Sequence, residues 1–268
     1  YMPHDDVRHI DWNVTARLQT PHVREHQEDR EVAAWLLLDL SGSVNFGSGH
    51  VSKRTLALEF SAVIARLLTR RGNRIGALIH AGGHLDNQFV QARSGRRHVL
   101  HLLRSIDSAQ TGNVPHDATD LASVLSDALA AIRRRSVVFV VSDFISLPGW
   151  DRAMSLLARR HDVVAVRLFD PLELDLPDLG MIALRDAETD ELLWVDSSDR
   201  GFRERFAQAA ADREQLLRDA LARSGVDCLE LATDEPLDQS LVRFLQLRKR
   251  RAQVSAGAFG AAAAAGTL

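Results

Sequence analysis

Five oxygen-bearing side chains occur at three places in the chain where they could form one metal site. Asp39, Ser41 and Ser43 follow an apolar run. Thr119 stands directly before a helical pattern, and Asp143 follows a second apolar run. Carboxylate and hydroxyl oxygens suit Mg²⁺, which keeps several waters and takes few protein carboxylates. The set therefore predicts a site for Mg²⁺, or for another divalent cation such as Mn²⁺ or Ca²⁺.

These five residues can meet only if the two apolar runs are strands of one sheet. Residues 33–40 and 137–141 are short apolar runs, which are typical of strands buried on both faces of a parallel sheet. In an open α/β sheet the ligand crevice lies outside the carboxyl ends of the strands, where the strand order reverses. We therefore expect the loop after each run, and the start of the helix at 119, to border one crevice.

The rest of the sequence alternates between strand and helix patterns. Apolar runs predict further strands at 74–80, 88–91, 162–169 and 226–231. Apolar residues at helical spacing predict helices at 52–71, 96–106, 119–134, 150–160, 202–224 and 236–251. This alternation predicts an α/β fold, in which a six-stranded, mostly parallel central sheet carries helices on both faces.

One stretch, at about 171–200, interrupts the alternation. Strand patterns at 181–184 and 192–195 flank a polar turn, which predicts a β-hairpin inserted in the domain. The expected organisation is a charged N-terminal arm, a domain with this hairpin, and an Ala/Gly-rich tail, at 1–30, 31–251 and 252–268 respectively.

The composition excludes several classes of protein. Hydrophobic residues make up 46% of the 268 residues and charged residues 26%, which is a globular mixture. The net charge of -3 argues against a strongly basic nucleic-acid binder. Cys228 is the one cysteine, so a disulfide within the chain and a zinc site built on several thiolates are excluded. The apolar runs are too short to span a membrane.

The start of the chain bears on its expected location. It begins at Tyr1 and shows no signal-peptide pattern, which favours a cytoplasmic location. Membrane association is expected only if a segment upstream of Tyr1 carries an anchor.

The Asp-x-Ser-x-Ser pattern after the first buried strand resembles the metal-ion-dependent adhesion site of von Willebrand factor type A domains. The resemblance implies a set of ligands from three loops: Asp39, Ser41 and Ser43 from the first, Thr119 from the second, and Asp143 from the third. The third loop departs from the usual Thr-Asp-Gly of these domains, since residues 142–144 read Ser-Asp-Phe.

Residues 1–17 resemble the signature of the bacterial domain-of-unknown-function family fifty-eight, with His4 where the family usually has Gly. The similarity extends to about Arg251. Members of that family are commonly encoded beside MoxR-type AAA+ ATPases. The resemblance therefore implies that such an ATPase is a partner in the remodelling or maturation of client proteins. A client that offers an acidic group would complete the shell of the ion.

Two function classes stay open at this point. The first is a non-enzymatic, Mg²⁺-dependent protein-binding module, and the second is a metal-dependent, phosphoesterase-like hydrolase that uses the same Asp/Ser cluster. A hydrolase needs a general base near the metal, and the local candidates, Asp120 and His116, are better explained as loop residues. Ser41 also stands where a haloacid-dehalogenase-type phosphatase has its second Asp. We therefore favour the binding module.

Overall fold

The computed structural model describes residues 15–17, 33–82, 87–109, 119–185 and 192–265. The chain divides into two compact units, at 1–31 and 32–268. In the first unit the structure describes only a helical turn at 15–17, so the charged arm expected at 1–30 lies almost wholly outside the described residues. The second unit holds the sheet and the candidate site.

The central sheet has six strands in the order β3-β2-β1-β4-β5-β8. Their bounds, in this spatial order, are β3 (Gln88–Arg93), β2 (Arg74–His80), β1 (Ala33–Asp39), β4 (Val137–Ser142), β5 (Asp162–Phe169) and β8 (Asp227–Ala232). Neighbouring strands are parallel except for β3, which pairs antiparallel with β2. The strand order reverses at β1, because the chain proceeds outward from it to β2 and later returns to β4 on its other side. The predicted six-stranded, mostly parallel sheet is confirmed.

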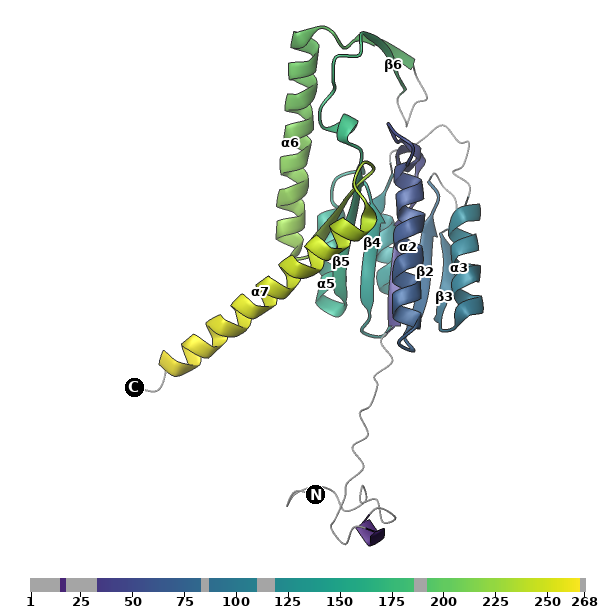
Figure 1. Cartoon of the computed structure of the whole chain (residues 1–268), viewed down its shortest axis with the longest axis vertical. Coiled ribbons are helices and arrows are strands. Elements are labelled where there is room, and N and C mark those ends of the chain that lie inside the picture. Colours follow the sequence, from purple (N-terminus) through teal and green to yellow (C-terminus); the bar gives the residue numbers. More distant parts are fainter. Residues whose placement is uncertain (1–14, 18–32, 83–86, 110–118, 186–191, 266–268) are drawn as a thin grey trace. The chain divides into compact units, whose positions relative to one another are not determined.

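Helices cover both faces of this sheet (Figure 1). On one face lie α2 (Lys53–Thr69), α3 (Arg96–Ser108) and α7 (Leu237–Ala265), and on the other lie α4 (Leu121–Ala131), α5 (Trp150–Arg160) and the C-terminal part of α6 (Arg200–Ser224). The alternation of side chains along β1 serves both layers. Leu36 and Leu38 join the core on the α2 side, whereas Trp35 and Leu37 join the core on the α4 side. β1 is therefore a central, fully covered strand.

The predicted inserted hairpin is also confirmed. β6 (Met181–Arg185) pairs antiparallel with β7 (Leu192–Asp196) in a separate two-stranded sheet. A short 3₁₀ helix, η3 (Pro171–Glu173), stands between β5 and this hairpin. The hydroxyl of Ser197 closes the base of the hairpin, since it donates to the carbonyl of Gly180 (2.8 Å) and accepts from the backbone N–H of Leu179 (2.9 Å).

The end of the last helix differs from the expectation. α7 does not stop near Arg251, where an Ala/Gly-rich tail was expected to begin, but continues to Ala265. Alanine has the highest intrinsic helix propensity, and residues 261–265 are all alanine, so the chain can remain helical beyond the packed part of the helix.

Candidate metal centre

β1 delivers the first carboxylate, Asp39, to the carboxyl end of the sheet, where the strand order reverses. The backbone N–H of Ser41 donates to Oδ1 of Asp39 (3.1 Å), and the hydroxyl of Ser142, at the end of β4, donates to Oδ2 (2.8 Å). The Asp39 residue is only 1% exposed. This carboxylate is therefore fixed at the junction of two adjacent strand ends, in a setting nearly as buried as the core.

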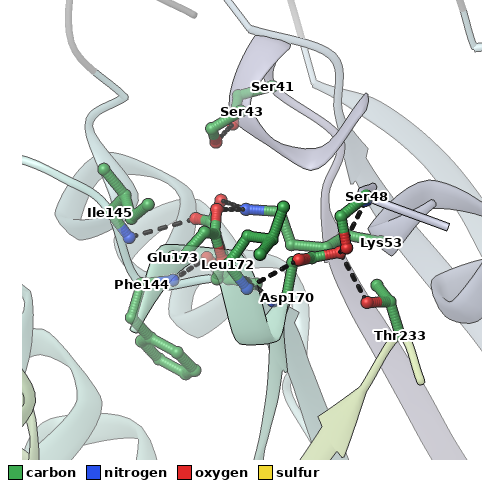
Figure 2. A network of polar contacts seen from close by, with 12 residues as sticks. Ser41, Ser43, Ser48, Lys53, Phe144, Ile145, Asp170, Leu172, Glu173 and Thr233 are labelled. Carbon is green, nitrogen blue, oxygen red and sulfur yellow. Dashed lines mark hydrogen bonds and ion pairs between the residues drawn. The ribbon is translucent and has the colours of Figure 1, made fainter. Parts of the chain in front are cut away.

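Two hydroxyls lie together in the loop that follows Asp39. Ser41 precedes the short 3₁₀ helix η2 (Gly42–Asn45), and its Oγ lies 3.3 Å from Oγ of Ser43. Figure 2 shows the two hydroxyls directed toward the polar network around Lys53. Because a hydroxyl can rotate and keeps lone pairs free while it donates, both can present oxygen to a cation.

The third loop holds Asp143, which is 5% exposed. Its Oδ1 accepts a hydrogen bond from the backbone N–H of Ile145 (3.0 Å), and its Oδ2 pairs with the ammonium of Lys53 (2.8 Å). The contact between Lys53 and this carboxylate joins residues 90 positions apart in the sequence. The structure thus brings Asp143 into the centre, and it adds a cation that the sequence did not predict there.

Phe144 stands in the third loop at the position where the resemblance to von Willebrand factor type A domains implies a glycine. Its φ angle is 60°, and it is the one residue other than glycine with positive φ among those the structure describes. This left-handed conformation costs a non-glycine residue about 1–2 kcal/mol. The backbone N–H of Phe144 donates to the Ser142 hydroxyl (2.9 Å), and its ring contacts Trp150 at a centroid distance of 5.1 Å. These two contacts offset the strain and hold the loop in place.

Lys53, the first residue of α2, is fully buried, with 0% exposure. Besides Asp143, its ammonium pairs with Oε1 of Glu173 in η3 (2.7 Å; Figure 2). Burial by itself would lower the pKa of Lys53, but the carboxylates of Asp143 and Glu173 outweigh burial and hold the pKa above its usual value. Lys53 is therefore charged inside the centre.

The centre nevertheless carries an excess of negative charge. Asp143 and Glu173 share one ammonium, that of Lys53, and Asp39 adds a third carboxylate close enough to Asp143 to feel its charge. Burial and then the charge of Asp143 raise the pKa of the Asp39 carboxyl, and the hydrogen bonds from Ser142 and Ser41 offset only part of this rise. A divalent cation would neutralise the remaining charge, and the carboxylate and hydroxyl oxygens match the ligands that Mg²⁺ takes. The residues present therefore fit the ion, with Asp39, Ser41 and Ser43 best placed to hold it.

The second loop is fastened to the third through its backbone. The carbonyl of Thr119 accepts hydrogen bonds from the hydroxyl of Ser146 (2.7 Å) and from the backbone N–H of Leu147 (3.0 Å). Asp120 caps α4, since its Oδ1 accepts from the backbone N–H of Ser123 (3.1 Å). These contacts place Thr119 beside the third loop, while a bond from its hydroxyl to the ion stays a prediction. His116 lies outside the described residues.

A third buried carboxylate, that of Asp170, holds the first loop through hydrogen bonds. Its Oδ2 accepts hydrogen bonds from the backbone N–H and the hydroxyl of Ser48 (2.8 and 2.9 Å) and from the hydroxyl of Thr233 (2.6 Å). Its Oδ1 accepts from the backbone N–H of Leu172 (2.9 Å; Figure 2). Burial would raise the pKa of Asp170, but these bonds hold it below its usual value. Asp170 thus joins the first loop to the ends of β5 and β8.

Among the residues that the structure describes, no group of three or more His, Cys, Asp or Glu side chains is placed to hold a metal ion. None of the helices that the structure describes is long and apolar enough to cross a membrane.

Comparisons with known sequences point to one family. Residues 1–216 match the family model described as "Protein of unknown function DUF58". An uncharacterized protein of Mycobacterium tuberculosis is 39% identical over 253 residues, which cover 94% of this chain and 78% of that protein. An uncharacterized protein of Mycobacterium avium is 35% identical over 164 residues, which cover 61% of this chain and 95% of that protein.

Comparisons with solved structures support the fold. A conserved hypothetical protein, BatB, from Bacteroides thetaiotaomicron superposes with a TM-score of 0.53 and 14% identity over 81% of this chain and 98% of that chain. An aerotolerance-related membrane protein from Bacteroides fragilis gives a TM-score of 0.53 and 12% identity over 81% and 97%. A von Willebrand factor type A protein from Catenulispora acidiphila matches more weakly, with a TM-score of 0.36 and 13% identity over 67% and 43%. At such identities the likeness to the two Bacteroides proteins concerns the fold alone.

Proposed function

We propose that this chain, which belongs to the DUF58 family of proteins of unknown function, is a non-enzymatic protein-binding module. In this proposal it uses Mg²⁺ to bind an acidic group of a partner. The observation that carries this proposal is the pair of buried carboxylates, Asp39 and Asp143, beside the adjacent hydroxyls of Ser41 and Ser43. Together they make an oxygen-rich, negatively charged cluster at the strand ends where the strand order reverses, which is the place of the predicted crevice.

The charge of the crevice explains why binding of an acidic partner needs the ion. Without it, Asp39 and Asp143 repel an incoming carboxylate. A bound Mg²⁺ would reverse the local charge and so attract that carboxylate, and the serine hydroxyls add no negative charge that would weaken this attraction.

The surroundings of the crevice favour a protein partner over a small substrate. Three large apolar side chains stand next to the ligand loops and are partly exposed: Phe46 (42%), Ile145 (39%) and Leu147 (47%). Phe46 follows η2 and its N–H donates to the carbonyl of Ser43, while the N–H of Ile145 donates to Asp143. Exposed apolar side chains that gather beside one site are typical of a protein-interaction surface.

The described carboxylates also favour binding over hydrolysis. Asp39 accepts two hydrogen bonds, Asp143 is paired with Lys53, and Asp120 serves as a helix cap. Each of these groups is engaged in holding the loops, which leaves the hydrolase alternative without a named general base in this part of the chain.

The proposed partners are a MoxR-type AAA+ ATPase and a client protein that offers an acidic side chain. The chain would present the client to the ATPase, or respond to it, through the Mg²⁺-bound crevice. An ATPase consumes ATP, so the proposal places the chain on the cytoplasmic side.

Removal of the ion or of its hydroxyl ligands should weaken partner binding. We expect EDTA, or the double variant Ser41→Ala/Ser43→Ala, to lower the affinity for the ATPase or its client by more than tenfold, about 1.4 kcal/mol or more. The measurement is the dissociation constant by surface plasmon resonance in Mg²⁺ and in EDTA. A matched control is Ser123→Ala/Ser126→Ala, which removes two exposed hydroxyls from α4. Affinity that persists unchanged in EDTA would show that the crevice is not the contact surface.

A further inference from the structure

A buried lysine inside the proposed metal site is the least expected feature of the molecule. Of the 33 lysine and arginine residues in the chain, only Lys53 and Lys249 are lysines. Lys53 is completely buried, whereas Lys249 lies exposed on α7. A charged side chain is rarely buried unless it is paired, and Lys53 has two carboxylate partners within 2.8 Å.

The ammonium of Lys53 is paired with an oxygen of Asp143, which belongs to the predicted ligand set. Oδ1 of Asp143 is already bonded to the backbone N–H of Ile145, and Oδ2 is paired with Lys53. The hydroxyls of Ser41 and Ser43 are directed toward the network around this ammonium (Figure 2), so a divalent ion held by them would stand on the same side as Lys53. Two like charges at such short range repel each other strongly in a buried site.

We propose that Lys53 is a built-in counter-ion of the metal-free crevice, and that a divalent cation must displace its ammonium from Asp143 in order to bind. This inference rests on the proposed function of the same crevice. Lys53 then acts as a positioning residue that sets how tightly the ion binds.

Glu173 gives the displaced ammonium a partner. Its Oε1 lies 2.7 Å from Lys53 Nζ, and its Oε2 accepts a hydrogen bond from the backbone N–H of Asp170 (3.0 Å). Lys53 can therefore release Asp143 and remain paired with η3. When the ion is bound, Glu173, in the segment between β5 and the hairpin, would then be the carboxylate that remains paired with Lys53.

The first test replaces the lysine by an uncharged side chain of similar length. Lys53→Met should raise the affinity for Mg²⁺ about tenfold or more, because it removes a positive charge beside the ion. The measurement is calorimetric titration of the full chain with MgCl₂, with thermal unfolding as the check of folding. Lys249→Met is the matched control and should bind Mg²⁺ as the wild type does. An unchanged or weaker affinity of Lys53→Met would overturn the inference.

The second test needs no variant, so it holds even if Lys53→Met does not fold. The wild-type chain is labelled with ¹⁵N-lysine, and the Nζ signals of its two lysines are compared by NMR in saturating Mg²⁺ and in EDTA. We expect the Nζ signal of Lys53 to differ between the two conditions, because the ammonium loses its pair with Asp143 when the ion binds, while the signal of Lys249 is the same in both. An unchanged Lys53 signal in Mg²⁺ would show that it keeps its bond to Asp143 when the ion is present.

Failure of this inference can be told apart from failure of the proposed function. A wild-type chain that binds no Mg²⁺ in the calorimeter overturns the metal site and this inference with it. A wild-type chain that binds Mg²⁺, with negative results at Lys53, overturns this inference alone.

Discussion

Asp39→Asn is expected to lower the affinity of the chain for Mg²⁺ by about 100-fold or more, because even the loss of a group that only supports a ligand costs about 10–100-fold. Asparagine keeps the shape of the side chain and one acceptor oxygen, but it removes the negative charge that attracts the ion. The metal-free variant should unfold near the same temperature as the wild type, because removal of the buried charge offsets the cost of turning the amide NH₂ toward the donor of Ser41 or Ser142. A buried charge beside Asp143 costs free energy when no cation neutralises it, and the substitution removes that cost.

Both halves of this expectation can be measured on the same samples. Calorimetric titration with Mg²⁺ gives the affinity, and thermal unfolding in EDTA gives the stability. Asp219→Asn, at an exposed position on α6, is the matched control and should change neither. Unchanged Mg²⁺ affinity in Asp39→Asn would remove this carboxylate from the ligand set. A loss of far-UV dichroism would instead assign it a structural role.

The second large effect is expected at Asp170, where Asp170→Asn should lower the free energy of unfolding by about 3 kcal/mol. Three donors converge on Oδ2 of Asp170 and a fourth reaches Oδ1. An asparagine must turn its NH₂ group toward one of these two sets, so at least one buried donor faces another donor. The first loop should lose the most stability, because Ser48 is hydrogen-bonded to this carboxylate at the end of β5.

The same carboxylate gives a defined pH dependence. The pKa of Asp170 is lower in the folded chain than its usual value of 3.8. Its contribution to stability is therefore fully present above pH 3.8 and is lost as the pH falls through 3.8 toward the folded pKa. Urea denaturation of wild type and Asp170→Asn should show a constant difference near neutral pH that shrinks below about pH 4. A difference that stays constant down to pH 3 would contradict the role assigned to this charge.

The sheet could be predicted from the sequence because its strands carry a local signal. Residues 33–39 and 137–142 are apolar on nearly every position, since both faces of β1 and β4 are covered by helices. The hairpin was equally readable, because a polar turn separates two short strand patterns. The extension of α7 to Ala265 was missed, because alanine and glycine together resemble a tail and carry no packing pattern.

The candidate site could be predicted only in part. Parallel strands end at the same edge of the sheet. This rule was enough to predict that the loop with Asp39, Ser41 and Ser43 lies near Asp143. Lys53 was not predicted, because a lysine in the first turn of a helix is ordinarily exposed and its partners lie 90 and 120 residues away. Asp170 was not predicted as part of the site either, because its bond to Ser48 spans 122 residues. Contacts between residues so far apart in the sequence produce no local sequence pattern from which they could be predicted.

The positive φ of Phe144 has a consequence for how this protein can change over evolutionary time. A glycine at 144 would adopt the same backbone angle without strain, but it would leave Trp150 without its ring partner. A smaller side chain at 150 would in turn remove the contact that offsets the strain at 144. The two positions are therefore epistatic, and substitutions at one should be tolerated mainly together with a compensating change at the other. Measured as a double-mutant cycle on unfolding free energy, Phe144→Gly and Trp150→Leu should be clearly non-additive, with a coupling of about 1 kcal/mol. We therefore expect the third loop and the start of α5 to change together rather than separately.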